Sequence, residues 1–291
     1  RFVVRHGPMR WGRREWCSYG AAGLATLAST RGARASEPVK VLLVGDSMIA
    51  TALGSELEAR LAEVPGLDVT RYGRSSSGLS RPDFFDWMAR ARKIRRRMTP
   101  DVVISMMGGN DAQAIFVGER SWIKWGAPTW EETYAARLEE LRGLLLPREG
   151  TWISVGLPPM RSPRFDAKLQ KVDALRSAAV AARPGDHFID TRNLLAPTGA
   201  YKERLTVGGR VKRVRAEDGI HLSRHGARLV ADYVQREAVA LLAARGPNPQ
   251  ANWKDKDAAL RFSNEALERM RALCRGRAGL PESATSPEFV A

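Results

Sequence analysis

Ser47 carries a hydroxyl that can attack a carbonyl, and it stands where an apolar segment ends. Residues 41–44 are apolar, and Gly45-Asp46-Ser47 and then helix-forming residues follow. A serine at the start of a helix is a common N-cap. The same position suits a nucleophile, because the free N–H groups and the dipole of a helix N-terminus favour negative charge. Both interpretations predict that a helix begins at Ser47.

The four histidines are the candidates for a general base, which catalysis near neutral pH usually needs. His6 lies in a basic leader, His187 opens an apolar segment, and His225 falls in the first turn of a predicted helix. His221 lies in the loop before that helix, three residues after Asp218. The aspartate can hold one ring nitrogen while the other takes a proton. By itself, the pair is equally compatible with a turn aspartate beside a surface histidine.

Asn110 is a candidate for stabilising negative charge on a substrate. It belongs to Gly108-Gly109-Asn110-Asp111, which follows an apolar segment. A side-chain amide aimed at a developing oxyanion typically contributes about 3 kcal/mol to transition-state stabilisation. The four residues are also typical of a turn, and the two roles are compatible.

Short apolar segments alternate with longer amphipathic ones along most of the chain. The pattern predicts strands at residues 39–44, 67–72, 101–107, 151–156 and 187–190. It predicts helices at residues 47–64, 84–98, 130–146, 165–182 and 223–243, and irregular structure at 194–217. This alternation indicates an α/β fold with a parallel sheet covered on both faces. Because ligands bind at the carboxyl ends of such strands, the loops after them should converge on one crevice.

The motifs together, in chain order, resemble those of the SGNH (GDSL-type) hydrolase superfamily. They are Gly45-Asp46-Ser47, a glycine in the second loop, Gly-x-Asn-Asp and a late Asp-x-x-His, and the resemblance covers residues 39–243. Residues 74–87, 156–161 and 218–221 are similar to an exported bacterial subgroup formerly classed as a domain of unknown function. The resemblance implies a three-layer, flavodoxin-like SGNH hydrolase fold with a central parallel sheet of about five strands.

The resemblance also implies catalytic roles. Ser47 would be the nucleophile, His221 the base and Asp218 the residue that orients the base. Asp46 would be structural, with its side chain directed away from the neighbouring hydroxyl. The mechanism implied is acyl transfer through a Ser-His-Asp triad, with no metal and no organic cofactor.

The same resemblance implies an oxyanion hole with three donors. They would be the backbone N–H groups of Ser47 and Gly78 and the side chain of Asn110. Gly73 is the rival for the glycine position, and Gly78 is preferred because it lies in the subgroup-like stretch at residues 74–87.

Three further residues in the subgroup-like stretches are candidates for substrate binding. Arg161 is placed to bind a substrate carboxylate, Trp87 to stack on a sugar, and Arg81 to line the crevice. The alternatives are surface arginines and a core aromatic residue. Residues 118–128 contain two tryptophans and form either a lid with a carbohydrate-contacting surface or a loop packed on the body.

The two ends of the sequence differ in pattern from the region between them, and we predict a separate segment at each end. Residues 1–35 hold seven arginines and one acidic residue, with paired arginines at 13–14, an uncharged stretch at 18–29 and Ala-x-Ala before Ser36. This pattern predicts an export signal of the twin-arginine type and a periplasmic or otherwise exported protein. Residues 36–245 would form the hydrolase domain, and residues 246–291 a linker, a helix at 252–275 and a tail.

The composition indicates which classes of partner the chain could bind. The formal charge of +15 favours contact with anionic surfaces, and the alternative is a solvated basic surface, which is the more common case. We find no helix-turn-helix, zinc-finger spacing or aromatic-basic platform that would indicate nucleic-acid binding. Cys17 would leave with the signal, so Cys274 alone predicts a mature chain with no internal disulfide and no cysteine-based metal site. No transmembrane span is expected in the mature chain.

Three functions are compatible with these residues. The first is an exported esterase that removes acyl groups from a cell-envelope carbohydrate. The second is an O-acyltransferase that uses the same site on an envelope polysaccharide. The third is an envelope binding protein with a vestigial site, which predicts no covalent reaction at Ser47.

Overall fold

The structure is a computed structural model that describes residues 37–146 and 150–244 of the chain. The predicted export signal at residues 1–35 lies outside the described residues. The predicted linker, helix and tail at residues 246–291 also lie outside them.

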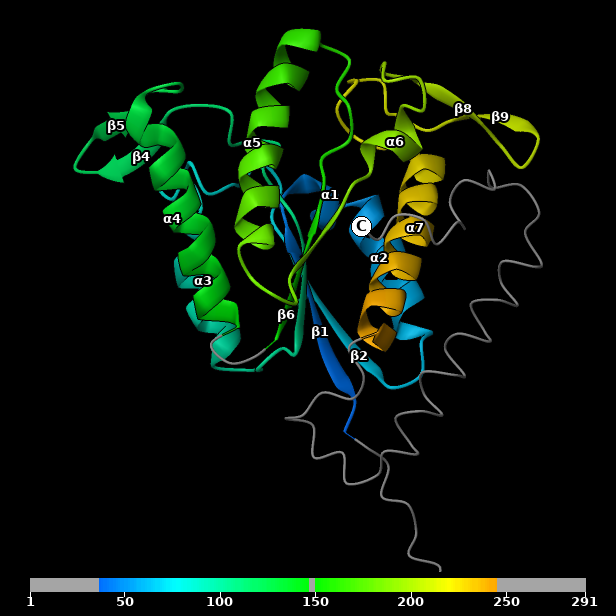
Figure 1. Cartoon of the computed structure of the whole chain (residues 1–291), viewed down its shortest axis with the longest axis horizontal. Coiled ribbons are helices and arrows are strands. Elements are labelled where there is room, and N and C mark those ends of the chain that lie inside the picture. Colours follow the sequence, from blue (N-terminus) through cyan, green and yellow to red (C-terminus); the bar gives the residue numbers. More distant parts are fainter. Residues whose placement is uncertain (1–36, 147–149, 245–291) are drawn as a thin grey trace, which may run out of the picture. The chain divides into compact units, whose positions relative to one another are not determined.

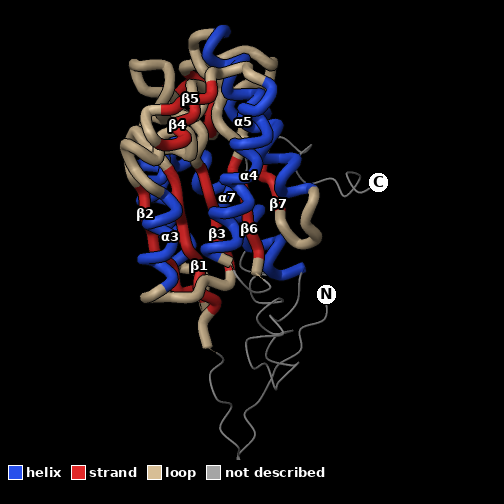
Figure 2. Tube along the Cα trace, turned by 90° about the vertical axis from the view of Figure 1, so that its left-hand side faces the viewer, coloured by secondary structure: helices blue, strands red, loops and turns tan. Residues whose placement is uncertain are grey.

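Five parallel strands form the central sheet, in the order β2-β1-β3-β6-β7. They are β1 (Val39–Gly45), β2 (Leu67–Gly73), β3 (Val102–Met106), β6 (Thr151–Val155) and β7 (His187–Ile189). Figure 2 shows the strands side by side in this order. Counted along this sheet alone, the order is the one that flavodoxin-like folds share. The predicted α/β, flavodoxin-like fold class is therefore confirmed.

Helices cover both faces of the sheet (Figure 1). One face carries α1 (Ser47–Ala50), α2 (Ala52–Ala62) and α7 (Arg224–Ala244), and the other carries α3 (Trp87–Arg95), α4 (Pro128–Leu145) and α5 (Pro163–Ala181). Successive side chains of a strand point to opposite faces, so Val41 and Leu43 of β1 join the first core while Leu42 and Val44 join the second. A strand buried on both faces reads as a continuous apolar run, which explains why β1 was predictable.

The helix predicted at residues 47–64 is broken into α1 and α2 at Thr51. Thr51 leaves the helical region, with φ −113° and ψ −147°. Just after the break, Gly54 lies so close to Ile49 that an added Cβ would stand 1.9 Å from the Ile49 carbonyl oxygen. Ser47 therefore sits on a single helical turn of its own.

Two hairpins and a short helix occupy segments expected to be loops. The first hairpin is β4 (Ile115–Gly118) with β5 (Ser121–Ile123), and the second is β8 (Arg204–Val207) with β9 (Arg210–Arg213). The short helix is α6 (Arg192–Leu195). The irregular structure predicted at residues 194–217 was therefore wrong for the part that forms β8 and β9. In Figure 1 the hairpins lie on opposite sides of α1, at the carboxyl end of the sheet.

No helix in the described ranges combines the length and the apolar character needed to cross a membrane.

Candidate active site

Three strand ends meet at one edge of the sheet. Gly45 at the end of β1 pairs with Gly73 of β2 and with Met106 of β3, so the loops after these strands emerge side by side. Gly45 and Gly73 allow the neighbouring backbones to approach closely at this edge. A Cβ on Gly45 would lie 2.0 Å from the Met106 carbonyl oxygen, and one on Gly73 would lie 2.3 Å from the Ala50 nitrogen. The edge is thus built by backbone packing, and Gly73 is part of that packing.

Ser47, His221 and Asp218 come together at this edge. The Ser47 Oγ lies 2.8 Å from Nε2 of His221, although the two residues are 174 positions apart in the chain. The Nδ1 atom of His221 lies 2.6 Å from Oδ2 of Asp218. The contact with a carboxylate places the ring proton on Nδ1, which leaves Nε2 to accept from the serine hydroxyl. This is the geometry that a Ser-His-Asp proton relay requires.

The loop itself holds Asp218 in its charged form. Its Oδ1 accepts from the backbone N–H groups of Ile220 (2.8 Å) and His221 (2.9 Å). Partial burial opposes the charge, but the bonds from the His221 ring and from these two amides outweigh it and lower the pKa of Asp218 to about 2. Asp218 is therefore ionised across the pH range in which histidine titrates.

Asp46 fastens the nucleophile loop to the neighbouring loop. Its carboxylate accepts from the N–H of Met48 (3.0 Å) and from the N–H of Gly109 (3.2 Å). Only 1% of the residue is exposed, and burial raises its pKa to about 6 against the opposing effect of the Met48 amide. Both carboxylate oxygens are taken up by backbone amides, so the structure gives Asp46 a positioning role.

The three proposed oxyanion donors lie on adjoining loops. The side-chain amide of Asn110 donates to the carbonyl of Ser77, 3.0 Å away, which leaves its second N–H available. This bond places Asn110 beside the Ser77–Gly78 peptide. Within the described residues, no protein group accepts from the backbone N–H of Ser47 or of Gly78. Such unoccupied donors are what an oxyanion hole needs.

Asp111 was not singled out from the sequence. It is fully buried, and its carboxylate accepts from the Ser80 N–H (2.8 Å) and from the Tyr134 hydroxyl (3.0 Å). Burial raises its pKa against the effect of these bonds. A Cβ on Gly78 would lie 2.1 Å from this carboxylate, so only glycine fits at that position. Asp111 thereby fixes the loop that carries Gly78.

Arg215 is a second residue that sequence reasoning missed. It is 1% exposed, and it donates to the backbone carbonyls of Pro159, Ile220 (2.7 Å) and His221 (3.4 Å). Burial lowers its pKa to about 10, so it remains charged at neutral pH. The side chain ties the His221 loop to the loop that follows β6. The sequence signal was weak, because Arg215 stands in a segment rich in exposed basic residues.

Arg161 also braces the loop of Asp218. Its backbone N–H donates to the Gly219 carbonyl (3.0 Å), and its Nη1 donates to the Glu217 carbonyl (2.7 Å). Gly219 has φ +74°, and an added Cβ would lie 2.6 Å from the Arg161 Cβ. These contacts give Arg161 a positioning role. Its side chain is still 48% exposed, so the predicted binding of a substrate carboxylate stays a prediction.

The structure places Trp87 differently from the substrate-binding hypothesis, whereas the predicted place of Arg81 in the crevice stays a prediction. Trp87 is 2% exposed, and its indole N–H donates to the Ser77 hydroxyl at 3.0 Å, so its ring has no free face for a sugar. The stacking role is corrected to a core role. Arg81 pairs with Asp83 at 2.8 Å and lies over the Trp122 ring at 5.1 Å, which links the second loop to the β4–β5 hairpin.

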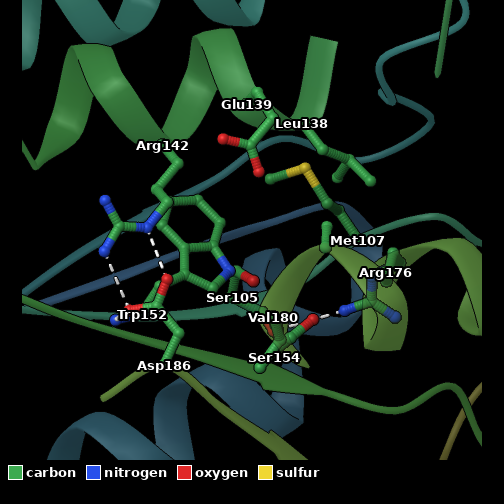
Figure 3. A pocket seen from close by; sticks show the side chains of 11 residues that line it. Ser105, Met107, Leu138, Glu139, Arg142, Trp152, Ser154, Arg176, Val180 and Asp186 are labelled. Carbon is green, nitrogen blue, oxygen red and sulfur yellow. Dashed lines mark hydrogen bonds and ion pairs between the residues drawn. The ribbon is translucent and has the colours of Figure 1, made fainter. Parts of the chain in front are cut away.

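Two pockets lie in the described part of the chain. Figure 3 shows the one between α4, α5 and the sheet, where Arg142 points toward Asp186 and forms an ion pair with it. The other, of about 280 Å³, is lined by Gly78 and Trp87 among others. Ser47 and His221 line neither of these two pockets, whereas Gly78, a proposed oxyanion donor, lines the second.

A match to a protein-family model establishes the family to which this chain belongs. Residues 40–237, more than half of the chain, match the family described as "Protein of unknown function (DUF459)". The chain belongs to this family. The DUF459 match includes Ser47, Asn110, Asp218 and His221, and it confirms the resemblance to a subgroup once classed as a domain of unknown function.

Similar solved structures accompany the DUF459 match, whereas no curated protein matches the chain. One is an acetyl xylan esterase from Geobacillus stearothermophilus, with 19% identity, coverage of 69% of this chain and 95% of that chain, and a TM-score of 0.49. A carbohydrate esterase family 3 protein from Talaromyces cellulolyticus has 16% identity, 70% and 98% coverage, and a TM-score of 0.44. A GDSL-like lipase from Bacteroides thetaiotaomicron has 14% identity, 71% and 89% coverage, and a TM-score of 0.46.

Proposed function

We propose that this chain is a serine esterase of the SGNH type. One observation carries the proposal: His221 joins the Ser47 hydroxyl at 2.8 Å to the Asp218 carboxylate at 2.6 Å. A hydroxyl, an imidazole and an ionised carboxylate in series are the parts that acyl transfer to serine needs.

The reaction begins when His221 takes the hydroxyl proton on Nε2. The Ser47 oxygen then forms a bond to the ester carbonyl carbon, and the carbonyl oxygen becomes an oxyanion held by Ser47 N–H, Gly78 N–H and Asn110. The charge on Asp218 stabilises the imidazolium. Collapse of the intermediate breaks the bond to the alcohol oxygen, which receives the proton from His221. Water activated by His221 then releases the acyl group by the same two steps.

For the substrate, we propose an O-acylated carbohydrate of the cell envelope. The side chains of His221 and Asp218 are 36% and 44% exposed, so the relay stands at the surface and is accessible to a large polymer. The export signal predicted at residues 1–35 supports an envelope location. The same residues would serve an acyltransferase, and only the identity of the acceptor differs.

The test is active-site labelling of the full chain with a fluorophosphonate, with mass spectrometry to locate the adduct and p-nitrophenyl acetate turnover as a second readout. We expect the adduct on Ser47. In Ser47→Ala and His221→Ala, turnover should fall by at least about 10³-fold, because a triad acts as a unit.

Matched controls are Ser55→Ala on α2 and His225→Ala, both at exposed positions close to the site residues in the sequence. Both should behave as wild type. An adduct on another serine, or equal losses in His221→Ala and His225→Ala, would contradict the proposed triad. Acyl transfer to an added sugar in preference to water would reassign the enzyme as an acyltransferase.

A further inference from the structure

The β8–β9 hairpin, together with Lys202 two residues before it, carries positive charge that no described acidic side chain neutralises. Lys202, Arg204 and Arg210 are exposed, and none of them contacts an acidic side chain of the described residues. The nearby Arg213 differs, since it pairs with Glu203 and Glu217. The three exposed cations are therefore available to an external anion.

The tip of this hairpin also exposes apolar surface. Val211 is 66% exposed and Val207 is 36% exposed. Between the two strands, Gly208 (φ 57°) and Gly209 (φ 72°) form a turn in which both central residues have positive φ, and a Cβ on either would meet nothing within 4 Å. The tip thus projects into open space. Each face of the hairpin carries one valine and one exposed arginine, Val207 with Arg210 on one face and Val211 with Arg204 on the other.

We propose that the β8–β9 hairpin docks on the anionic headgroups of a phospholipid bilayer. Cations near an anionic membrane surface gain attraction from its negative potential, and small apolar side chains gain by entering the interfacial region. An anionic polysaccharide would satisfy the cations but would leave both valines in water. The combination of the two residue types at one projecting tip therefore favours the bilayer.

The hairpin is bonded to the loop that carries His221, since the Ser223 hydroxyl donates to the Arg213 carbonyl at the end of β9. The residues after β9 extend this contact. The Ser223 N–H donates to the Val214 carbonyl (3.0 Å), and the Ala216 N–H donates to the His221 carbonyl (2.8 Å). In Figure 1 the hairpin and α1 lie at the same end of the sheet. A bilayer bound by the hairpin would therefore lie next to the edge at which Ser47 and His221 meet. This proposal does not depend on the proposed esterase activity.

The experiment is vesicle flotation of the full chain. The vesicles contain either equal parts of phosphatidylglycerol and phosphatidylcholine, or phosphatidylcholine alone. The hairpin variant carries Lys202→Gln, Arg204→Gln and Arg210→Gln. The matched control removes one lysine and two arginines from the exposed end of α3 and the residues after it, through Lys93→Gln, Arg96→Gln and Arg97→Gln.

We expect wild type to float with the anionic vesicles and much less with the neutral ones. Each cation near the surface contributes about fivefold to partitioning, so the hairpin variant should bind at least tenfold more weakly. The α3 control should remain within about twofold of wild type, because only its contribution to overall charge is lost. A second variant, Val207→Ser with Val211→Ser, should bind several-fold more weakly with all charges retained.

Equal losses in the hairpin and α3 variants would overturn the proposal, because binding would then follow net charge alone. Equal binding of wild type to neutral vesicles would overturn it as well. So would retention on a soluble anionic polysaccharide without vesicle binding, which would assign the hairpin to a polymer. Thermal unfolding of each variant verifies that all are folded, and fluorophosphonate labelling in the same samples reports the esterase site separately.

Discussion

Only one residue separates Ser47 from the buried strand β1. His221, by contrast, lies near the end of the long segment that follows β7, the last strand of the sheet. Buried carboxylates hold the Ser47 half, since Asp46 accepts from the Gly109 N–H and Asp111 accepts from the Ser80 N–H. Arginines hold the His221 half: Arg215 donates to three backbone carbonyls, and Arg161 to the carbonyl of Glu217. In these contacts, carboxylates accept from backbone N–H groups on the Ser47 side and arginines donate to backbone carbonyls on the His221 side. Each side also has a contact of the other kind, since Asp218 accepts from the His221 N–H and Arg71 donates to the Ile49 carbonyl.

The difference follows from the local backbone. Loops that emerge from parallel strands and start a helix present unpaired N–H groups, which a carboxylate can collect. The loop between β9 and α7 (Arg224–Ala244) presents carbonyls to Arg215 in addition to the N–H groups that Asp218 binds, and the fork of an arginine can collect such carbonyls. Near neutral pH only one of the two buried groups can lose its charge. Burial raises the pKa of Asp46 to about 6, whereas burial lowers the pKa of Arg215 only to about 10.

The largest effect we expect from a change in these supporting loops is that of Asn110→Ala, on the Ser47 side. Loss of one oxyanion donor should lower kcat for p-nitrophenyl acetate by about 10²–10³-fold with a smaller change in KM. Asn193→Ala on α6 is the control, because it removes an exposed amide far along the chain from the loop. An unchanged kcat in Asn110→Ala would limit Asn110 to its turn and its bond to Ser77.

The second prediction concerns Asp46 and the pH dependence of folding. Burial raises its pKa from 3.8 to about 6, so the folded chain binds this proton more tightly than the unfolded chain. The contribution of Asp46 to stability therefore rises as pH falls through 6 toward 3.8, and the cost of its ionisation is fully present above 6. Relative to Asp46→Asn, wild type should gain about 2 kcal/mol between pH 7.5 and pH 4.5.

Urea unfolding of both proteins at the two pH values measures this difference, and carboxyls common to both proteins cancel from it. The exposed Asp68→Asn variant is the control for removal of one carboxylate without burial. A gap that stays constant between the two pH values would mean that Asp46 does not change its ionisation on folding.

The Ser47 half was predictable because its constraints are local. Residues 41–44 form a strand buried on both faces, so their apolar run and the turn after it identify the strand and its carboxyl end. Ser47 and Asn110 then follow their strands within a few positions. The break at Thr51 was not predictable, because it depends on how closely Gly54 packs against Ile49.

In the His221 half, only the Asp-x-x-His motif could be predicted from the sequence. Asp218 and His221 could be paired from their spacing, but nothing in the sequence distinguishes the buried Arg215 from the exposed arginines around it. The turn of the β4–β5 hairpin contains Glu119 and Arg120 at positive φ, where glycine or asparagine would have given a signal. By contrast, Gly208 and Gly209 in the second hairpin did carry that signal.

The smallest effect we expect is on the His221 side, from Arg215→Met. This change removes the donors to the Pro159, Ile220 and His221 carbonyls while it keeps an apolar side chain of similar length. The His221 ring should then be held less well against Ser47, and kcat should fall by about tenfold with little change in KM, since small displacements of a catalytic group are costly.

Arg215→Lys keeps the charge and one donor group, so its kcat should lie between those of Arg215→Met and wild type. Turnover is divided by the number of Ser47 sites that fluorophosphonate labels, which removes any loss of folded protein from the comparison. If kcat per labelled site equals that of wild type in Arg215→Met, the arginine supports only stability, and the two halves of the site do not differ in the way described.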